Sequence, residues 1–188
     1  MNPPKHDEKV RAIAAAVKER IADKKPVHIS KGGVSHFVPL PNDPRRKSMP
    51  IDISSLNQVL EIDVKRRVCV AEPGITFAAL VEATLAKGLL PIVVPELEGI
   101  TIGGAVAGCS VESMSYRYGG FHDGCLEYEV VSGSGEVVRC SPEKDPHLFE
   151  MVHGSYGTFG ILTKLTFKLV PAKPYVKMTY AKFHDFKT

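Results

Sequence analysis

The residues of this sequence best suited to chemistry are glycines and hydroxyl residues in short clusters. The densest cluster is residues 98–108, where four glycines alternate with β-branched residues. Glycine lets the backbone turn sharply and lets a large group approach it closely. This pattern is typical of backbone beside a phosphate-bearing cofactor, although paired glycines also mark ordinary turns and bulges.

A second cluster follows the short apolar run 26–29. Successive backbone N–H groups in a glycine-containing turn form a nest for phosphate oxygens, and nearby hydroxyls add donors. This second cluster therefore predicts an anion-binding loop, with a plain β-turn as the alternative. The residues of this loop are Gly32, Gly33, Val34 and Ser35.

Two further motif-bearing segments, residues 110–119 and 153–163, follow along the chain. The four segments together resemble the FAD-binding domain of the vanillyl-alcohol-oxidase superfamily, the PCMH-type fold, over residues 26–174. Within that superfamily the sequence most resembles the Δ24-sterol reductases, the 24-dehydrocholesterol reductase or Diminuto group. The matching motifs are Val-Pro-Glu-Leu at 94–97, Val-Glu-Ser-Met-Ser at 111–115, Tyr-Gly at 118–119 and the stretch 170–177.

The resemblance implies that FAD is the cofactor and that residues 32–35 hold its pyrophosphate. It also implies a second group of contacts along the cofactor: Pro95, Glu96, Thr101, Gly103, Gly104, Ser110, Ser113, Gly160 and Ile161. Gly160 and Ile161 would act through main-chain groups.

Attachment of the cofactor is expected to be non-covalent. Some members of the superfamily bind FAD through a histidine directly after the two glycines of the pyrophosphate loop, where this sequence has Val34. Others use a cysteine just before the second glycine-rich segment, where this sequence has Glu98 and Gly99.

Catalytic residues are not assigned by the sequence. In flavoenzymes the cofactor carries the hydride chemistry, and protein groups position the substrate and tune the cofactor. A polar segment could face the flavin, but a structural role explains each member better. Its members are Glu112, Tyr116, Arg117, Tyr118 and His122.

The resemblance implies the flavin-binding part of an oxidoreductase that reduces an apolar C=C bond. The chain ends soon after the last strand expected for this domain, so we expect no cap domain and allow for a separate substrate-domain polypeptide as partner. Two alternatives stay open, a non-catalytic flavin-binding subunit and a degenerate structural or interaction module. A yellow flavin colour after purification would distinguish the flavin-binding alternatives from a degenerate module without flavin.

The elements that must position these motifs alternate between helix and strand. Helices are predicted over residues 7–22, 77–87 and 145–152, and Thr76 is the expected N-cap of the second. Extended runs are predicted at 27–30, 51–53, 56–63 and 68–74, and a hairpin at 127–140. A final strand is predicted over residues 160–169, where apolar and polar residues alternate as in a half-exposed strand. The fold class is α+β, with two α/β subdomains at 26–95 and 96–174, an N-terminal helix within 1–25, and a tail or first cap element at 175–188.

Composition and charge limit the other classes of partner and location. The chain has 188 residues and a net charge of +3, and its two basic clusters lack interleaved aromatics, so no nucleic-acid partner is expected. No apolar run reaches the roughly 18 residues of a membrane span, and the start lacks a signal-peptide core. The four cysteines are too widely spaced for a metal pair, so no metal is expected, and free thiols suggest a cytoplasmic location.

Overall fold

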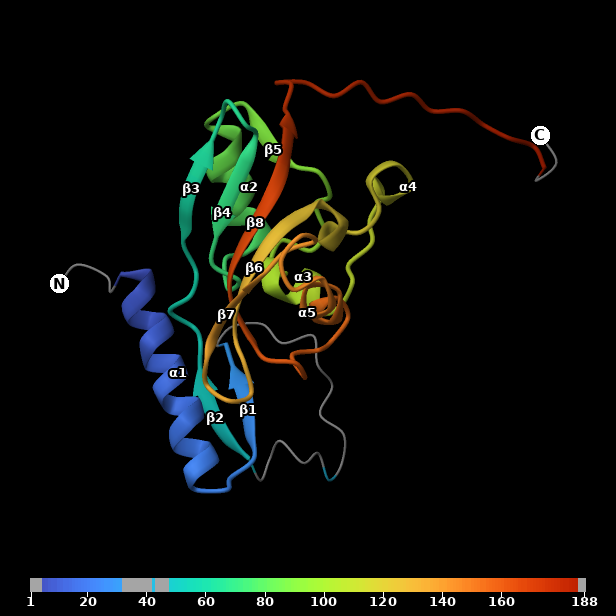
Figure 1. Cartoon of the computed structure of the whole chain (residues 1–188). Coiled ribbons are helices and arrows are strands. Elements are labelled where there is room, and N and C mark those ends of the chain that lie inside the picture. Colours follow the sequence, from blue (N-terminus) through green and yellow to red (C-terminus); the bar gives the residue numbers. More distant parts are fainter. Residues whose placement is uncertain (1–4, 32–41, 43–47, 186–188) are drawn as a thin grey trace.

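The computed structural model of the chain describes residues 5–31, 42 and 48–185 (Figure 1). These residues form two sheets with helices packed around them, which confirms the predicted α+β class. The smaller sheet pairs β1 (Val27–Ser30) with β2 (Met49–Asp52) in parallel.

The larger sheet is antiparallel and has six strands. Its longest strand, β8 (Ile161–Pro171), lies at the centre, and its residues alternate between buried and partly exposed over most of the length, as the sequence predicts. The sheet draws strands from both sides of residue 95, the predicted boundary between subdomains. The other strands are β3 (Val59–Asp63), β4 (Val68–Ala71), β6 (Cys125–Val131), β7 (Val137–Cys140) and β5 (Leu89–Pro91).

The main core joins segments that lie far apart in the chain. The rings of Phe77 and Phe121 meet edge to face with centroids 5.0 Å apart, and Phe121 lies 5.3 Å from Phe167. Phe77 opens α2 (Phe77–Leu85), whose N-cap Thr76 accepts the Ala79 N–H as predicted. Burial of these three rings fixes α2 and the 3₁₀ turn η2 (Phe121–Gly124) against the sheet.

A second core lies beneath the first helix, α1 (His6–Ala22). The helix turns Val10, Ile13 and Val17 towards the protein, and they pack with Ile51 of β2 and Ile161 of β8. Figure 1 shows α1 running alongside the β1–β2 pair. The helix therefore supports β2, which pairs with β1, the strand that leads into the predicted phosphate-binding loop.

The glycine-rich segment differs from expectation in its second half. The turn is confined to residues 98–99, and α3 (Ile102–Ala107) follows. Thr101 is the N-cap of this helix, because its Oγ1 accepts the Gly104 N–H at 3.3 Å. The expected sharp bend through the glycine pair is therefore replaced by one and a half turns of helix.

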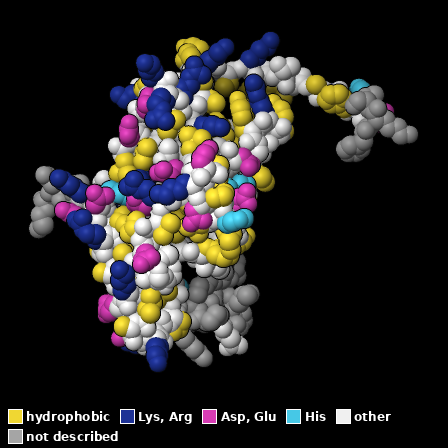
Figure 2. All heavy atoms as spheres, viewed as in Figure 1, with side chains coloured by type: hydrophobic (Ala, Val, Ile, Leu, Met, Phe, Trp, Pro, Cys, Tyr) yellow, Lys and Arg dark blue, Asp and Glu magenta, His cyan; other side chains and the backbone are white. Residues whose placement is uncertain are grey.

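The remaining elements are short. They are α4 (Ser115–Tyr118) and α5 (Pro146–Val152), the second of which is capped by Asp145. Residues 172–185 form no helix or strand and extend away from the body. On the face shown in Figure 2, Lys and Arg side chains are interspersed with Asp and Glu, with no large area of one sign.

Candidate functional site

Three segments carrying sequence motifs meet beside α3. The backbone N–H groups of Gly154 and Tyr156 donate to Val106 O at 3.1 Å and Ala107 O at 3.0 Å, which ties the loop after α5 to the end of α3. A Cβ on Gly157 would lie 3.1 Å from Ile29 Cδ1, so the same loop also lies against β1. The end of β1, the glycine helix and the loop 153–160 are therefore neighbours.

Gly103 and Gly104, predicted together, have different surroundings. A Cβ on Gly103 would lie 2.5 Å from Pro73 Cβ, so this glycine allows α3 to pack against the end of β4. Gly104 is exposed, and a Cβ there would meet only Thr101 Oγ1 at 3.1 Å and Lys31 Nζ at 3.7 Å. Close approach of a cofactor is therefore open at Gly104 and not at Gly103.

The first backbone donors of α3 already have partners within the protein. The N–H groups of Ile102 and Gly103 donate to Ile75 O and Pro73 O at 3.1 and 2.8 Å. The Gly104 N–H donates to Thr101 Oγ1, so the threonine oxygen is an acceptor here and only its own proton is left to donate. The glycine-rich segment therefore provides room for a cofactor, whereas its first backbone donors are already used within the protein.

Lys31 is the residue that the motif analysis missed. It follows directly after β1, is exposed, and its ammonium faces Gly104. A cation beside bare backbone suits a pyrophosphate. The position of Lys31 directly before the predicted loop is a signal that the sequence does contain. Its proximity to Gly104, 73 positions away in the chain, is shown only by the fold. The predicted loop residues Gly32, Gly33, Val34 and Ser35 lie outside the described residues.

The two predicted serines lie after α3. The Ser110 N–H donates to Ala105 O at 2.8 Å and its carbonyl accepts the Phe121 N–H at 3.1 Å, so its backbone anchors this segment to α3 and η2. Ser110 is half-buried, whereas Ser113 is exposed in the loop before α4. Ser110 is therefore held near α3, and within the part of the chain described here no backbone hydrogen bond joins Ser113 to that helix.

Gly160 and Ile161 face the protein interior. Gly160 has φ +145°, and a Cβ would lie 2.6 Å from Val130 Cγ1 and 2.7 Å from Val131 O. Ile161 is buried in the core beneath α1. Only the main chain of these two residues can meet a cofactor, which is the manner of contact that the sequence predicts.

Pro95 and Glu96 belong to the loop between β5 and α3. Pro95 is buried and Glu96 is exposed. The loop is held against α2 because the Phe77 N–H donates to Ile100 O at 2.9 Å. The isolated bridge between Thr76 and Thr101 pairs the N-cap of α2 with the N-cap of α3.

A hydrogen bond and a ring contact link β6, the start of the loop 153–160 and η2. The hydroxyl of the buried Tyr128 lies 2.9 Å from His153 Nε2, and the rings of His153 and His122 have centroids 4.9 Å apart. Burial, followed by the nearby His122, lowers the pKa of His153. Sequence patterns give no sign of the Tyr128–His153 pair, whose members are 25 positions apart. The pair joins β6 to the start of the loop 153–160.

The described residues contain no group of three or more His, Cys, Asp or Glu side chains placed to hold a metal ion. All four cysteines are free; Cys69, Cys125 and Cys140 are buried and Cys109 is half-buried. Burial raises the pKa of the Cys69 and Cys125 thiols to about 12, so they are inert packing groups. Among the described helices, none combines the length and apolar character that a membrane crossing requires.

Comparison with known proteins gives a consistent result. Residues 3–141 match the family described as FAD binding domain. The chain is 32% identical over 179 residues to the Δ24-sterol reductase of Homo sapiens, a match covering 95% of this chain and 35% of that protein. It is 37% identical over 115 residues to cytokinin dehydrogenase 3 of Oryza sativa subsp. japonica, covering 61% of this chain and 22% of that protein.

The fold also has a solved counterpart. The crystal structure of 6-hydroxy-D-nicotine oxidase from Arthrobacter nicotinovorans superimposes with a TM-score of 0.71 at 21% sequence identity, covering 85% of this chain and 34% of that one. This similarity confirms the predicted fold. The chain spans about a third or less of the length of these relatives.

Proposed function

We propose, because this chain belongs to the family of FAD-binding domains, that it is the flavin-binding part of an oxidoreductase that reduces a carbon–carbon double bond in an apolar, sterol-like substrate. When bound, FAD would supply the hydride chemistry, and the residues of this chain would hold and orient it. The observation that carries flavin binding is the bare backbone of Gly104 facing the ammonium of Lys31. The reaction and the substrate class are supported by the likeness to the Δ24-sterol reductase.

The residues fit FAD as follows. Lys31 and the adjoining loop 32–35 would bind the pyrophosphate, whose charge a lysine complements. Gly104 would leave room for the cofactor, and the half-buried Ser110 would add a hydroxyl. Main-chain groups at residues 160–161 would meet the adenosine end.

Substrate contacts would come from a further part of the protein. Several apolar side chains after α3 are exposed, among them Val111 at 67% and Tyr116 at 84%. Apolar residues of the extended tail are exposed too, including Tyr175 and Tyr180 at 87% and 86%. Exposed apolar side chains at this density are typical of surfaces that another element covers. We infer that a substrate-binding polypeptide, in the same or a separate chain, packs there.

Bound flavin should be released by acid. Non-covalent attachment predicts that acid precipitation leaves the protein pellet colourless and the FAD in the supernatant. Flavin fluorescence that stays with the pellet after thorough washing and unfolding would show a covalent bond.

The reaction class can be tested by anaerobic reoxidation of the reduced flavin. With this chain alone, the rate should be the same with and without a Δ24-sterol, because contacts remote from the reacting bond orient a substrate and these are assigned elsewhere. With the substrate-binding polypeptide added, reoxidation should depend on the unsaturated sterol and not on its saturated counterpart.

Two results would contradict this assignment. Rapid, saturable reoxidation by sterol in the isolated chain would show that the substrate site is already complete. Equal rates with saturated and unsaturated sterol in the complemented mixture would remove double-bond reduction as the reaction.

A further inference from the structure

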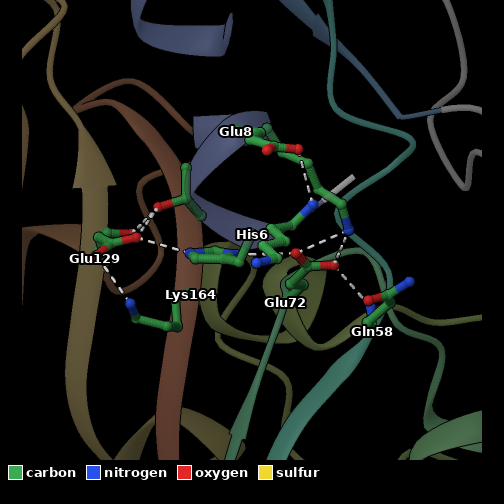
Figure 3. A network of polar contacts seen from close by, with 9 residues as sticks. His6, Glu8, Gln58, Glu72, Glu129 and Lys164 are labelled. Carbon is green, nitrogen blue, oxygen red and sulfur yellow. Dashed lines mark hydrogen bonds and ion pairs between the residues drawn. The ribbon is translucent and has the colours of Figure 1, made fainter. Parts of the chain in front are cut away.

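His6, the first residue of α1, lies between two buried carboxylates (Figure 3). Its Nδ1 is 2.9 Å from Glu72 Oε1, and its Nε2 is 2.9 Å from Glu129 Oε1. Glu72 is 0% exposed and Glu129 is 4% exposed. Because an ionised carboxylate only accepts hydrogen bonds, both ring nitrogens must carry protons, and His6 is an imidazolium.

Other partners keep Glu72 ionised. Lys9 Nζ, also buried, lies 3.0 and 2.9 Å from its two oxygens, and the Gln58 N–H donates to Oε2 at 2.9 Å. Burial alone would raise the pKa of Glu72, but hydrogen bonds from His6, Lys9 and Gln58 together lower it. Glu72 thus remains an anion although it is fully buried.

Glu129, on β6, is held in the same way by side chains of the two neighbouring strands, β7 and β8. Its Oε2 accepts from Lys164 Nζ at 2.9 Å and from Arg139 Nε at 3.2 Å, and its Oε1 accepts from the Thr163 hydroxyl at 3.2 Å. Burial would raise the pKa of Glu129, but the contacts with His6, Lys164 and Arg139 lower it well below its usual range. The bonds to Glu129 and then Glu72 raise the pKa of His6 to about 9, against burial and the charge of Lys164.

Each carboxylate is linked to a segment assigned to the cofactor, Glu72 through the next residue of the chain and Glu129 through hydrogen bonds. Glu72 precedes Pro73, which packs on Gly103 and accepts its N–H at 2.8 Å. Glu129 is bonded through side chain and carbonyl to Thr163, three positions after Gly160 on β8. His6 therefore connects α1 to the supports of both segments.

We propose that His6 is a positioning residue for the cofactor site: its protonated ring bridges the supports of α3 and of the start of β8, so FAD binds more tightly when His6 carries its second proton. The inference rests on the proposed function, because it concerns FAD at that site. A plain structural role would instead lower FAD affinity equally at every pH.

The test is the dissociation constant of FAD between pH 6.5 and 10 for the wild type and His6→Gln. Couplings between sites are typically about 5- to 150-fold, and for a tenfold coupling we expect wild-type affinity to fall about fivefold by pH 10, where His6 is only partly deprotonated in the complex. His6→Gln should bind about tenfold more weakly at pH 7, the same coupling lost, and should show no such fall. Any ionisation of the flavin itself affects both proteins equally, so the pH profile of His6→Gln serves as the baseline for the wild type.

Two control variants separate charge from packing. Ile13→Ala loosens the buried face of α1 without touching the charges, so it should keep the wild-type dependence on pH. His147→Gln makes the same exchange at an exposed histidine and should behave as wild type. A fall in affinity retained in His6→Gln would overturn the inference alone, whereas a wild type that binds no FAD at any pH would overturn the proposed function first.

A second measurement covers the case in which His6→Gln does not fold. Linkage is reciprocal, so FAD must strengthen proton binding at His6 by the same factor, about tenfold. The His6 ring can be followed by NMR titration of the wild type with and without FAD. An identical titration midpoint in both states would overturn the inference.

Discussion

Replacing Gly104 with valine is expected to abolish FAD binding while the chain stays folded. A branched side chain there would occupy the space between α3 and Lys31, which the cofactor needs. In the free protein only Thr101 Oγ1, at 3.1 Å from the new Cβ, must give way, and glycine is itself unfavourable in a helix by about 1 kcal/mol. We expect affinity to fall by about a hundredfold or more, which is ~3 kcal/mol. Equilibrium titration with FAD measures it.

Two other glycines provide the controls. Gly133 lies in the turn between β6 and β7 with nothing within 4 Å of a Cβ, so Gly133→Val should keep full affinity. Gly103→Val should instead unfold the protein, because its Cβ would meet Pro73 at 2.5 Å. Unchanged FAD affinity in Gly104→Val would remove this residue from the site.

Glu129→Gln is expected to destabilise the fold by about 3 kcal/mol, because removing one partner of a buried ion pair leaves the others uncompensated. Lys164 would keep its charge beside a neutral amide of the same shape, and His6 would lose the larger of the two contacts that raise its pKa. Urea unfolding measures the loss. Glu136→Gln, an exposed glutamate in the β6–β7 turn, should change stability by less than about 0.5 kcal/mol.

The difference between wild type and Glu129→Gln should also depend on pH. The folded-state pKa of Glu129 is lowered, so its contribution is present above its unfolded pKa of about 4.5 and is lost as pH falls. The pKa of His6 is raised to about 9, so its contribution is full below 6.5 and is lost as pH rises through about 9. The variants should differ most between about pH 4.5 and 6.5, and a difference constant from pH 4 to 10 would contradict the ionic account.

Local signals in the sequence predicted a good part of this fold. The alternation along β8, the Thr76 cap of α2 and the hairpin of β6 with β7 all depend on neighbouring residues, and each is confirmed. The helical state of residues 102–107 could not be predicted this way, because glycine disfavours helix. Contacts with Pro73 and the Thr101 cap outweigh that preference, and they belong to the tertiary structure.

The site was predicted only in part for the same reason. Motifs proposed Gly103 and Gly104 together as candidates, and the distinction between them rests on which neighbour each faces. His6 contacts Glu72 and Glu129, which are 66 and 123 positions away in the chain. No periodicity in a sequence indicates that such distant residues are neighbours. The anion-binding loop at residues 32–35 stays a prediction.

The most direct test of the central claim is titration of the purified chain with FAD and, in parallel, with riboflavin, followed by flavin absorbance and fluorescence. Riboflavin lacks the pyrophosphate and adenosine that Lys31 and the adjoining segments are proposed to hold. The account predicts saturable binding of one FAD per chain and at least about a hundredfold weaker binding of riboflavin, a difference of ~3 kcal/mol. Absence of saturable FAD binding, or equal affinity for the two flavins, would contradict it.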